Sequence, residues 1–449
     1  MKKFDINLII FLFILVIYLV GQFLIGTYNP DDKRFVFDAP ADVDFLYYGA
    51  IVNMLLNSFP PENPAFAGVK LTQPFLQYYP AAVLAKIFNP YNSIRILNVI
   101  YLVLFGLLLK KYFPRRYGLP LIILFASSSL FVSINAVGVD FIARGFTHVP
   151  FFILITVALF DKRLFLRLLS VFLAGLLNGY LMLIFGIYLG VTLLLHRDRE
   201  NLLIFISSLL GLLLASLIVS SEAVEKPVYF ILSESYGFNP VEIIKHAAPF
   251  LILAFICRHK AMTILMIISI IFGSLIHYNP FFPVFMIYFS GALLLADGEI
   301  KFPGAESLVY LFICVLFIGF LISSYDKYNP DSRHYYPRYD FRIEKAVNWI
   351  KENTAQNSVF MALTADENNL GLIMQDRPVY LGYIGHVSHL GLQWHQRYDD
   401  LLKLYKIGSV PKNVDYIFYG PIEKKYFPNT PIKLPTCYND EYVEIFKAE

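Results

Sequence analysis

Long apolar runs separated by short polar turns occupy most of the first 324 positions of the chain. About 20 mostly apolar residues are needed to cross a bilayer as a helix, and several runs reach or approach that length. The pattern predicts about eleven membrane-spanning helices and therefore a mainly α fold. They are expected near residues 6–26, 93–110, 119–137, 147–160, 164–178, 181–196, 201–220, 241–257, 261–277, 281–296 and 305–324. Residues 164–195 also allow one long helix with a kink near Asn178.

The first apolar run follows a positively charged start, "MKKFD", as the apolar part of a signal peptide does. However, the run at 6–26 is longer than such a segment, and no small-residue cleavage site follows it. We therefore interpret it as an uncleaved first span.

The long polar segment at 27–92 has a pattern of its own. Residues 44–59 are predicted to form an amphipathic helix, and the proline- and glycine-rich stretch 59–68 is predicted to be a turn. Residues 73–88 are apolar, but they are too few and too marked by proline for a span. We expect them to lie along the membrane interface.

After residue 324 the pattern changes to that of a small α/β domain, expected at 325–449. Ile343, Ala346, Val347 and Ile350 share one face of a predicted helix at 341–353. A second predicted helix covers 393–408 and ends at its glycine. Predicted strands cover 358–364, 377–382, 414–420 and 441–448.

The composition supports a membrane protein of many spans. Hydrophobic residues make up 57% of the 449 positions, and charged residues make up only 16%, against about 25% in a soluble domain. Mean hydropathy is +0.57. The net charge of +3 is small, and no basic tract indicates a nucleic-acid partner. Cys257, Cys314 and Cys437 lie far apart, so neither a disulfide framework nor a cysteine metal site is predicted.

Positive charge between the spans predicts their orientation. With Lys2 and Lys3 in the cytoplasm, every short basic turn falls on the same side, as the positive-inside rule requires. These turns are 110–116, 161–167, 196–200, 257–260 and 297–301. The external side then receives 27–92, 138–146, 221–240, 277–280 and the tail from Tyr325. This alternation supports an odd number of spans.

Asp38, Asp42 and Asp44 follow the first span closely and are the first candidates for chemistry. An ionised carboxylate beside the bilayer can take the proton of a hydroxyl group as that hydroxyl attacks a sugar. Partial desolvation would raise its pKa toward a useful value. The alternative is that these residues cap a helix or lie in solvent, since an Asp-x-Asp pair alone is a weak signal.

Asp140, Arg144 and His148 are spaced four apart and would share one face of a helix, if that stretch is helical. Asp140 is then a candidate for orienting an acceptor or a metal, and Arg144 and His148 are candidates for binding a phosphate. The alternative is an Asp–Arg pair that ties the loop to the following span.

Other cationic residues are placed near the external surface. Arg95 begins the second span and either binds a lipid phosphate or extends toward the headgroups. Arg338 belongs to a basic aromatic cluster at 332–342, which suits phosphate binding or anchoring to anionic lipid. Lys245 and His246 permit the same two interpretations.

With these elements in place, the chain resembles the GT-C superfamily of integral membrane glycosyltransferases. It is most similar to the branch of protein-mannosyltransferase-like and aminoarabinose-transferase-like enzymes. The resemblance lies in "DVDF" at 42–45, in the interfacial helix and Arg-marked span at 78–109, and in the span, acidic loop and span at 124–154. In the tail it lies in 346–353, 377–382 and 414–427.

The resemblance implies inverting transfer of a sugar from a polyprenyl-phosphate donor to a lipid, glycan or protein acceptor on the external face. By match to the family's first-loop acid, Asp42 or Asp44 is the general base, and Asp140 matches the second-loop acid. Here "DVDF" replaces the commoner Asp-Glu pair, which leaves open which aspartate is the base. Arg95, Arg144, His148 and Arg338 are then the candidates for binding the donor phosphate.

No cofactor or metal is expected. The tail has no clear match to the oligosaccharyltransferase signature, and monosaccharide-transferring members of the superfamily generally use no metal. His386, His389 and His395 have no evident further ligand, so a structural or acceptor-contact role is favoured for them over metal binding.

The predicted location is a bacterial or archaeal plasma membrane, since the external segments contain no Asn-x-Ser/Thr sequon. Two alternatives remain open: a transporter or lipid flippase, and an envelope-assembly protein that has lost its catalytic acids. A transporter fits less well, because ionisable residues cluster at the span ends and no two halves of the chain match.

Overall fold

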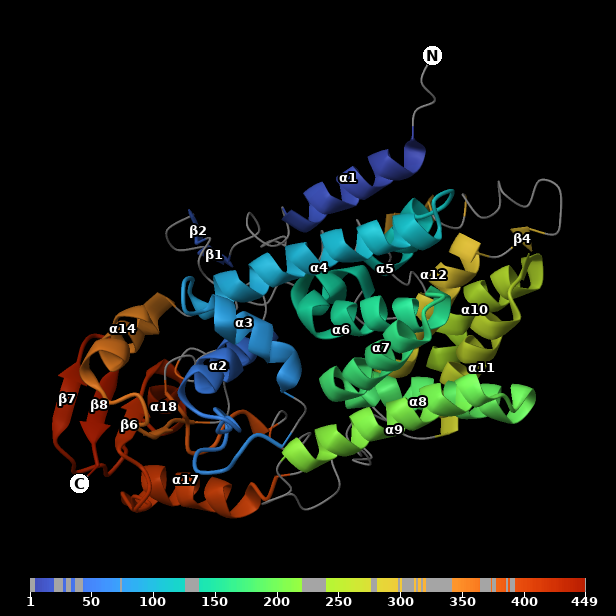
Figure 1. Ribbon diagram of the computed structural model, residues 1–449. Helices are drawn as coiled ribbons and strands as arrows, with labels where there is room; N and C mark the ends of the chain where they lie inside the picture. Colours follow the sequence, from blue (N-terminus) through green and yellow to red (C-terminus); the bar gives the residue numbers. More distant parts are fainter. Residues whose placement is uncertain are drawn as a thin grey trace. The chain divides into compact units, whose positions relative to one another are not determined.

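The computed structural model divides the chain into two compact units (Figure 1). The first contains Met1–Ile25, Arg95–Ile218 and Leu232–Tyr336, and the second contains Gly26–Ile94, Val219–Ile231 and Pro337–Glu449. The structure describes residues 5–19, 27–29, 34–36, 43–72, 75–125, 137–219, 240–275, 281–297, 299–300, 311, 314–315, 318–319, 341–363, 373, 377–384, 387 and 392–448. The second unit therefore groups the segment after α1 with the tail, while the predicted domain boundary at 324 stays a prediction.

The first unit is built from apolar helices. They are α1 (Ile6–Leu19), α4 (Pro90–Tyr112, whose first turn belongs to the second unit), α5 (Gly118–Phe125), α6 (Val137–Phe160), α7 (Leu164–Leu177), α8 (Gly179–His196), α9 (Arg199–Ile218), α10 (Pro240–Ile256), α11 (Lys260–Leu275) and α12 (Phe281–Asp297). Two short strands, β3 (Cys257–Arg258) and β4 (Glu299–Ile300), pair antiparallel. Within the described ranges, α4, α8 and α9 are long and apolar enough to cross a membrane, and shorter apolar helices accompany them.

These helices confirm most of the predicted positions. Residues 164–195 form two helices, α7 and α8, as predicted, and not the single kinked helix that the sequence also allowed; the Asn178 side chain caps α8 by accepting from the Leu181 amide at 3.1 Å. One prediction was wrong: α6 begins at Val137, so the stretch 138–146, predicted as a loop, is helical. Its charges suggested a loop, but they are spaced four apart and no proline precedes Pro150 in this helix. Most of the predicted last span, 305–324, lies outside the described residues.

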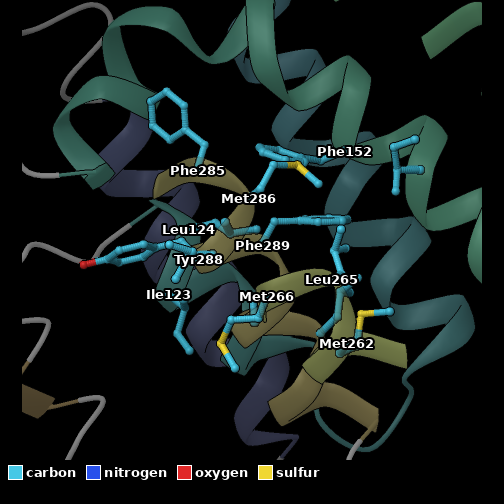
Figure 2. Packing of buried hydrophobic residues seen from close by; sticks show 14 of the residues in the cluster. Ile123, Leu124, Phe152, Met262, Leu265, Met266, Phe285, Met286, Tyr288 and Phe289 are labelled. Atoms are coloured by element: carbon cyan, nitrogen blue, oxygen red, sulfur yellow. The ribbon is translucent and has the colours of Figure 1, made fainter. Parts of the chain in front are cut away.

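The core of the helical unit centres on α12, which contacts α5, α8, α10 and α11. Figure 2 shows Phe152 of α6 beside Phe289 of α12, with Met262 and Leu265 of α11 nearby. The rings of Phe152 and Phe289 stack at 4.4 Å between centroids. The apolar runs therefore bury one another, and the outward side chains of α9 stay exposed, as expected for a lipid-facing surface.

Helices α7 and α9 approach each other through glycines. A Cβ on Gly211 would overlap the carbonyl oxygen of Phe172 and lie 3.1 Å from its carbonyl carbon. A Cβ on Gly175 would lie 3.0 Å from the backbone of Gly211. Small residues allow such close helix contacts in membranes, where packing drives association.

Gly211→Ala is therefore expected to destabilise the protein, by about 1–3 kcal/mol, because backbone atoms must move apart. Gly186→Ala on α8 is the matched control, since a Cβ there meets nothing within 4 Å. Thermal unfolding in detergent should show a lower midpoint for the first variant alone. Equal midpoints would contradict the close α7–α9 contact.

The second unit contains short helices around a small sheet. From the first loop come the antiparallel hairpin β1 (Thr27–Asn29) and β2 (Arg34–Val36), α2 (Val43–Asn57), the 3-10 helix η2 (Leu76–Tyr78) and α3 (Tyr79–Leu84). From the tail come η4 (Phe341–Ile343), α14 (Glu344–Asn353), α17 (His395–Ile407), α18 (Pro421–Tyr426), and strands β5 (Phe360–Met361), β6 (Tyr416–Tyr419), β7 (Thr436–Asn439) and β8 (Glu444–Lys447). The sheet order is β5-β6-β8-β7, with β5 and β6 parallel and the other pairs antiparallel.

The α/β character of the tail is thus confirmed, and α17 ends at Gly408 in the left-handed conformation, as predicted. The predicted strand at 377–382 forms only an isolated bridge, from Val379 to Phe360. Helix α2 confirms the helix predicted in the first loop, but it is buried around most of its circumference and is not amphipathic. Tertiary contacts contribute to this burial, because α2 packs on η2 and α3.

Candidate functional site

The structure places the predicted site residues unequally. Asp42 and Arg338 lie outside the described residues, as does Asp38. Asp44 lies in the first turn of α2, and Asp140 and Arg144 lie in α6, but only the backbone of these three is described. Arg95 and His148 are described in full.

The stretch that contains Asp140, Arg144 and His148 is helical, which was the condition for these residues to share one face. All three lie within Val137–Phe160 and are spaced four apart, so they occupy one face of the helix on successive turns. The backbone therefore places these three positions along one face of the N-terminal half of this helix.

Arg95 of α4 is buried, with 4% of its surface exposed. Three residues further along the same side of α4, Asn98 accepts a short hydrogen bond from the backbone amide of Phe146 in α6. A buried guanidinium is costly unless charges or hydrogen bonds inside the protein compensate it. This burial favours a role for Arg95 within the protein over extension toward lipid headgroups.

His148 is enclosed by aromatic rings of α12. It is 7% exposed, and its ring lies 4.5 Å from that of Phe285 and 6.1 Å from that of Phe282. The carbonyl of its neighbour Thr147 accepts from the Asn178 side chain at 3.4 Å. The position of His148 is therefore fixed by α12 and by the junction of α7 and α8.

Gly145 allows α1 to pack closely against α6, beside Asn98 of α4. A Cβ there would overlap the Tyr18 hydroxyl and lie 3.2 Å from Asn98 Oδ1. Tyr18 itself is fully buried and packs edge-on against Phe125 at 5.6 Å. The N-terminal half of α6 thus contacts α1, α4, α12 and the junction of α7 and α8.

Buried polar side chains gather around this part of the apolar unit. They are Arg95, Asn98, Thr147, His148 and Asn178, with His246 of α10 on another side of α12, 6.0 Å from the Tyr288 ring. Asn98 and Asn178 were not predicted from the sequence as members of this group. Asn98 could have been predicted, because it lies three residues after Arg95 and therefore on the same side of a helix. Asn178 indicated only a break between two helices.

The basic turns assigned to the cytoplasm lie together at the other end of α6. Asp161 accepts from Tyr112 at 2.8 Å and from Lys111 at 3.3 Å, and it pairs with Arg163. Hydrogen bonds from the Arg163 side chain and amide, and from Tyr112, hold the pKa of Asp161 well below its ordinary value. An ionised Asp161 therefore joins the end of α4 to the turn after α6.

Further contacts extend this end to the other basic turns. Arg167 pairs with Glu200, and His259 pairs with Asp297 at 2.9 Å. The start of α1 joins as well, because Asp5 accepts from the Tyr117 hydroxyl at 3.2 Å. The grouping of short basic turns that the sequence predicted is therefore present in the structure.

A cavity of about 130 Å³ lies at this same end, lined by groups that include Arg167, Asn201 and His259. It opens beside residues 158–160, ten to twelve positions after His148, or about 15–18 Å along α6. It is thus remote from His148. In the described part of the chain, no group of three or more His, Cys, Asp or Glu side chains is placed to hold a metal ion.

No protein-family model matches the chain, and the comparison with curated proteins finds no match. Solved structures match over nearly its whole length. ArnT from Cupriavidus metallidurans bound to undecaprenyl phosphate is 11% identical with a TM-score of 0.54, and its apo state is 12% identical with a TM-score of 0.55. Each match covers 98% of this chain and 97% of the other.

A second similar structure is the archaeal oligosaccharyltransferase AglB from Archaeoglobus fulgidus, in complex with an inhibitory peptide and a dolichol-phosphate. It is 12% identical with a TM-score of 0.50, and the match covers 94% of this chain and 70% of AglB. The chain therefore has the fold of the GT-C membrane glycosyltransferases, which confirms the resemblance seen in the sequence.

Proposed function

Starting from this shared fold, we propose that the protein is a membrane glycosyltransferase that takes its sugar from a polyprenyl-phosphate donor. The observation that carries the proposal is the nearly full-length likeness to ArnT, whose structure contains undecaprenyl phosphate. A donor with a polyprenyl tail stays in the bilayer, so its enzyme needs the apolar helical unit that this chain has. The acceptor is a lipid, a glycan or a protein, and transfer inverts the anomeric carbon.

In the proposed reaction, Asp42 or Asp44 accepts the proton of the acceptor hydroxyl. The hydroxyl oxygen forms a bond to the anomeric carbon, and the bond from that carbon to the phosphate oxygen breaks. The polyprenyl phosphate leaves with the electron pair of that bond. Asp140 orients the acceptor.

Cationic groups stabilise the charge on the departing phosphate. We assign this role to Arg95, Arg144, His148 and Arg338. The place of Arg144 and His148 on one face of α6 supports the assignment. No metal or cofactor takes part in the proposed reaction.

The proposed topology places the N-terminus in the cytoplasm and the tail outside a plasma membrane. Supporting it, the start of α1 and the basic turns gather at one end of the helical unit. Positive charge of this kind marks the cytoplasmic side of membrane proteins. Likeness to two glycosyltransferases also favours an enzyme over the transporter or flippase alternative.

The test is donor turnover by the purified full-length protein in proteoliposomes. We expect it to bind undecaprenyl phosphate or dolichyl phosphate but not the uncharged polyprenols. With a panel of polyprenyl-phosphate monosaccharides and membrane extract as acceptor, we expect release of free polyprenyl phosphate.

Failure to consume any donor, together with no phosphate-dependent lipid binding, would contradict the proposal. Movement of unaltered donor between leaflets, faster than in protein-free vesicles, would instead support the flippase alternative.

A further inference from the structure

After α2, the first external loop folds into a tight hairpin at residues 61–71. The Asn63 amide donates to the Val69 carbonyl at 2.8 Å, and the Leu71 amide donates to the Pro61 carbonyl at 2.9 Å. Gly68 closes the turn with φ of +80°, a conformation that favours glycine. The hairpin therefore has a defined shape of its own.

The tip of this hairpin forms backbone hydrogen bonds with the tail. The Val379 amide donates to the Pro64 carbonyl at 2.9 Å, and the Ala67 amide donates to the Val379 carbonyl at 3.0 Å. The Gly382 amide donates to the Ala65 carbonyl at 2.7 Å. Val379 also bridges Phe360 of β5 in parallel, so the hairpin tip is bonded to the segment that lies at the β5 edge of the tail's sheet.

Arg397 of α17 contacts both partners of this junction, the hairpin and the segment around Tyr380. One guanidinium nitrogen donates to the Tyr380 carbonyl at 2.5 Å, and the other donates to the Ala67 carbonyl at 2.8 Å. The guanidinium carbon lies 3.6 Å from the centre of the Phe66 ring and 4.8 Å from that of Tyr380. A planar guanidinium can stack on the two rings while donating to two carbonyls, which an ammonium group cannot do.

The hairpin is joined to the end of α2 by residues 58–60. In this connection the Ser58 amide donates to the Met54 carbonyl at 3.0 Å, which continues the last turn of α2, and the Phe59 ring packs edge-on against Phe75 at 5.6 Å. Nearer the start of α2, the Tyr48 ring packs against the Tyr78 ring of η2, with 5.7 Å between centroids. The short connection therefore links the hairpin that Arg397 binds to the helix whose first turn contains Asp44.

We propose that Arg397 is a positioning residue for sugar transfer: it fixes the hairpin to the tail and thereby sets the place of α2 and Asp44. This inference rests on the proposed function. A general base must be held close to its working geometry, since a misplacement of about 1 Å costs on the order of 100-fold in rate. The tail is then part of the catalytic framework, although Arg397 touches no reacting atom.

The test compares Arg397→Ala and Arg397→Lys with the control Lys406→Ala, an exposed cation on the same helix. We expect Arg397→Ala to lower kcat by about 10- to 100-fold, with little change in the KM for the donor. Arg397→Lys should recover only part of the rate, because an ammonium replaces the planar fork. Hydrogen exchange should rise at the Ala67 and Gly382 amides in the Arg397 variants, while Ile417 and Ile445 in the sheet stay protected.

Wild-type kcat in Arg397→Ala, alongside faster exchange at Ala67, would overturn the inference. If this variant loses protection throughout the tail, Phe66→Leu decides, because it removes only the ring stacked on the guanidinium. Lower kcat with an intact sheet would then support the inference, and unchanged kcat would overturn it. Wild-type protein that transfers no sugar would contradict the proposed function instead, while exchange at Ala67 would still report on the junction.

Discussion

Replacement of Asp44 or Asp42 by asparagine is expected to abolish most sugar transfer, with kcat falling by about 10²- to 10⁴-fold for the aspartate that is the base. Asparagine keeps the size of the side chain but cannot accept the proton of the attacking hydroxyl. Asp44 begins a buried helix within the second unit, which gives it a defined backbone position. The two single variants together therefore identify the base that the sequence left open.

The measurement is kcat at saturating donor in proteoliposomes, with Asp399→Asn on α17 as an exposed control. Affinity for polyprenyl phosphate should stay near the wild-type value in both variants, because cationic residues are assigned to the phosphate. Wild-type rates in two well-folded variants would remove the first-loop aspartates from the mechanism. A loss of lipid affinity would instead indicate that they act in donor binding.

The largest expected effect on stability comes from Glu423 of α18. This residue is 2% exposed, and its two carboxylate oxygens accept from the Leu363 amide at 2.7 Å and the Gly420 amide at 2.9 Å. These amides follow β5 and β6, so one side chain ties together the ends of two parallel strands. Glu423→Ala would leave two buried N–H groups without their acceptor, at about 1–3 kcal/mol each.

Glu423→Gln tests the same contact more narrowly. Its amide offers one oxygen, and its NH₂ group then faces an N–H donor, so we expect a smaller loss of stability than with alanine. Glu441→Ala is the control, since that side chain is exposed. Thermal unfolding and hydrogen exchange at Leu363 and Gly420 are the measurements. Equal stability of Glu423→Ala and Glu441→Ala would show that the carboxylate does not stabilise the tail.

The sequence by itself determined where most helices lie. Backbone polar groups must be satisfied within each segment in a bilayer, so the length of an apolar run predicts a helix such as α8 or α9. Spacing along a helix is also local information, which is why the common face of Asp140, Arg144 and His148 was predictable once that stretch is helical. Gly408 marked the end of α17 for the same reason, since a left-handed residue there needs no distant partner.

Only the tertiary structure decided which segments pair. Residues 377–382 read as a strand, but their partners at 64–67 are separated from them by about 300 residues, and no local pattern encodes that choice. Nothing in the sequence distinguished Arg397 or Glu423 from the other charged residues of the tail. Strand β7 was missed because it is short and three of its four residues are exposed, so it shows no clear alternation of apolar and polar residues. The periodicity of a helix and the burial it implies can be predicted from residues that are neighbours in the sequence. The partner of a backbone group or of a buried charge instead depends on the free energy of the whole fold.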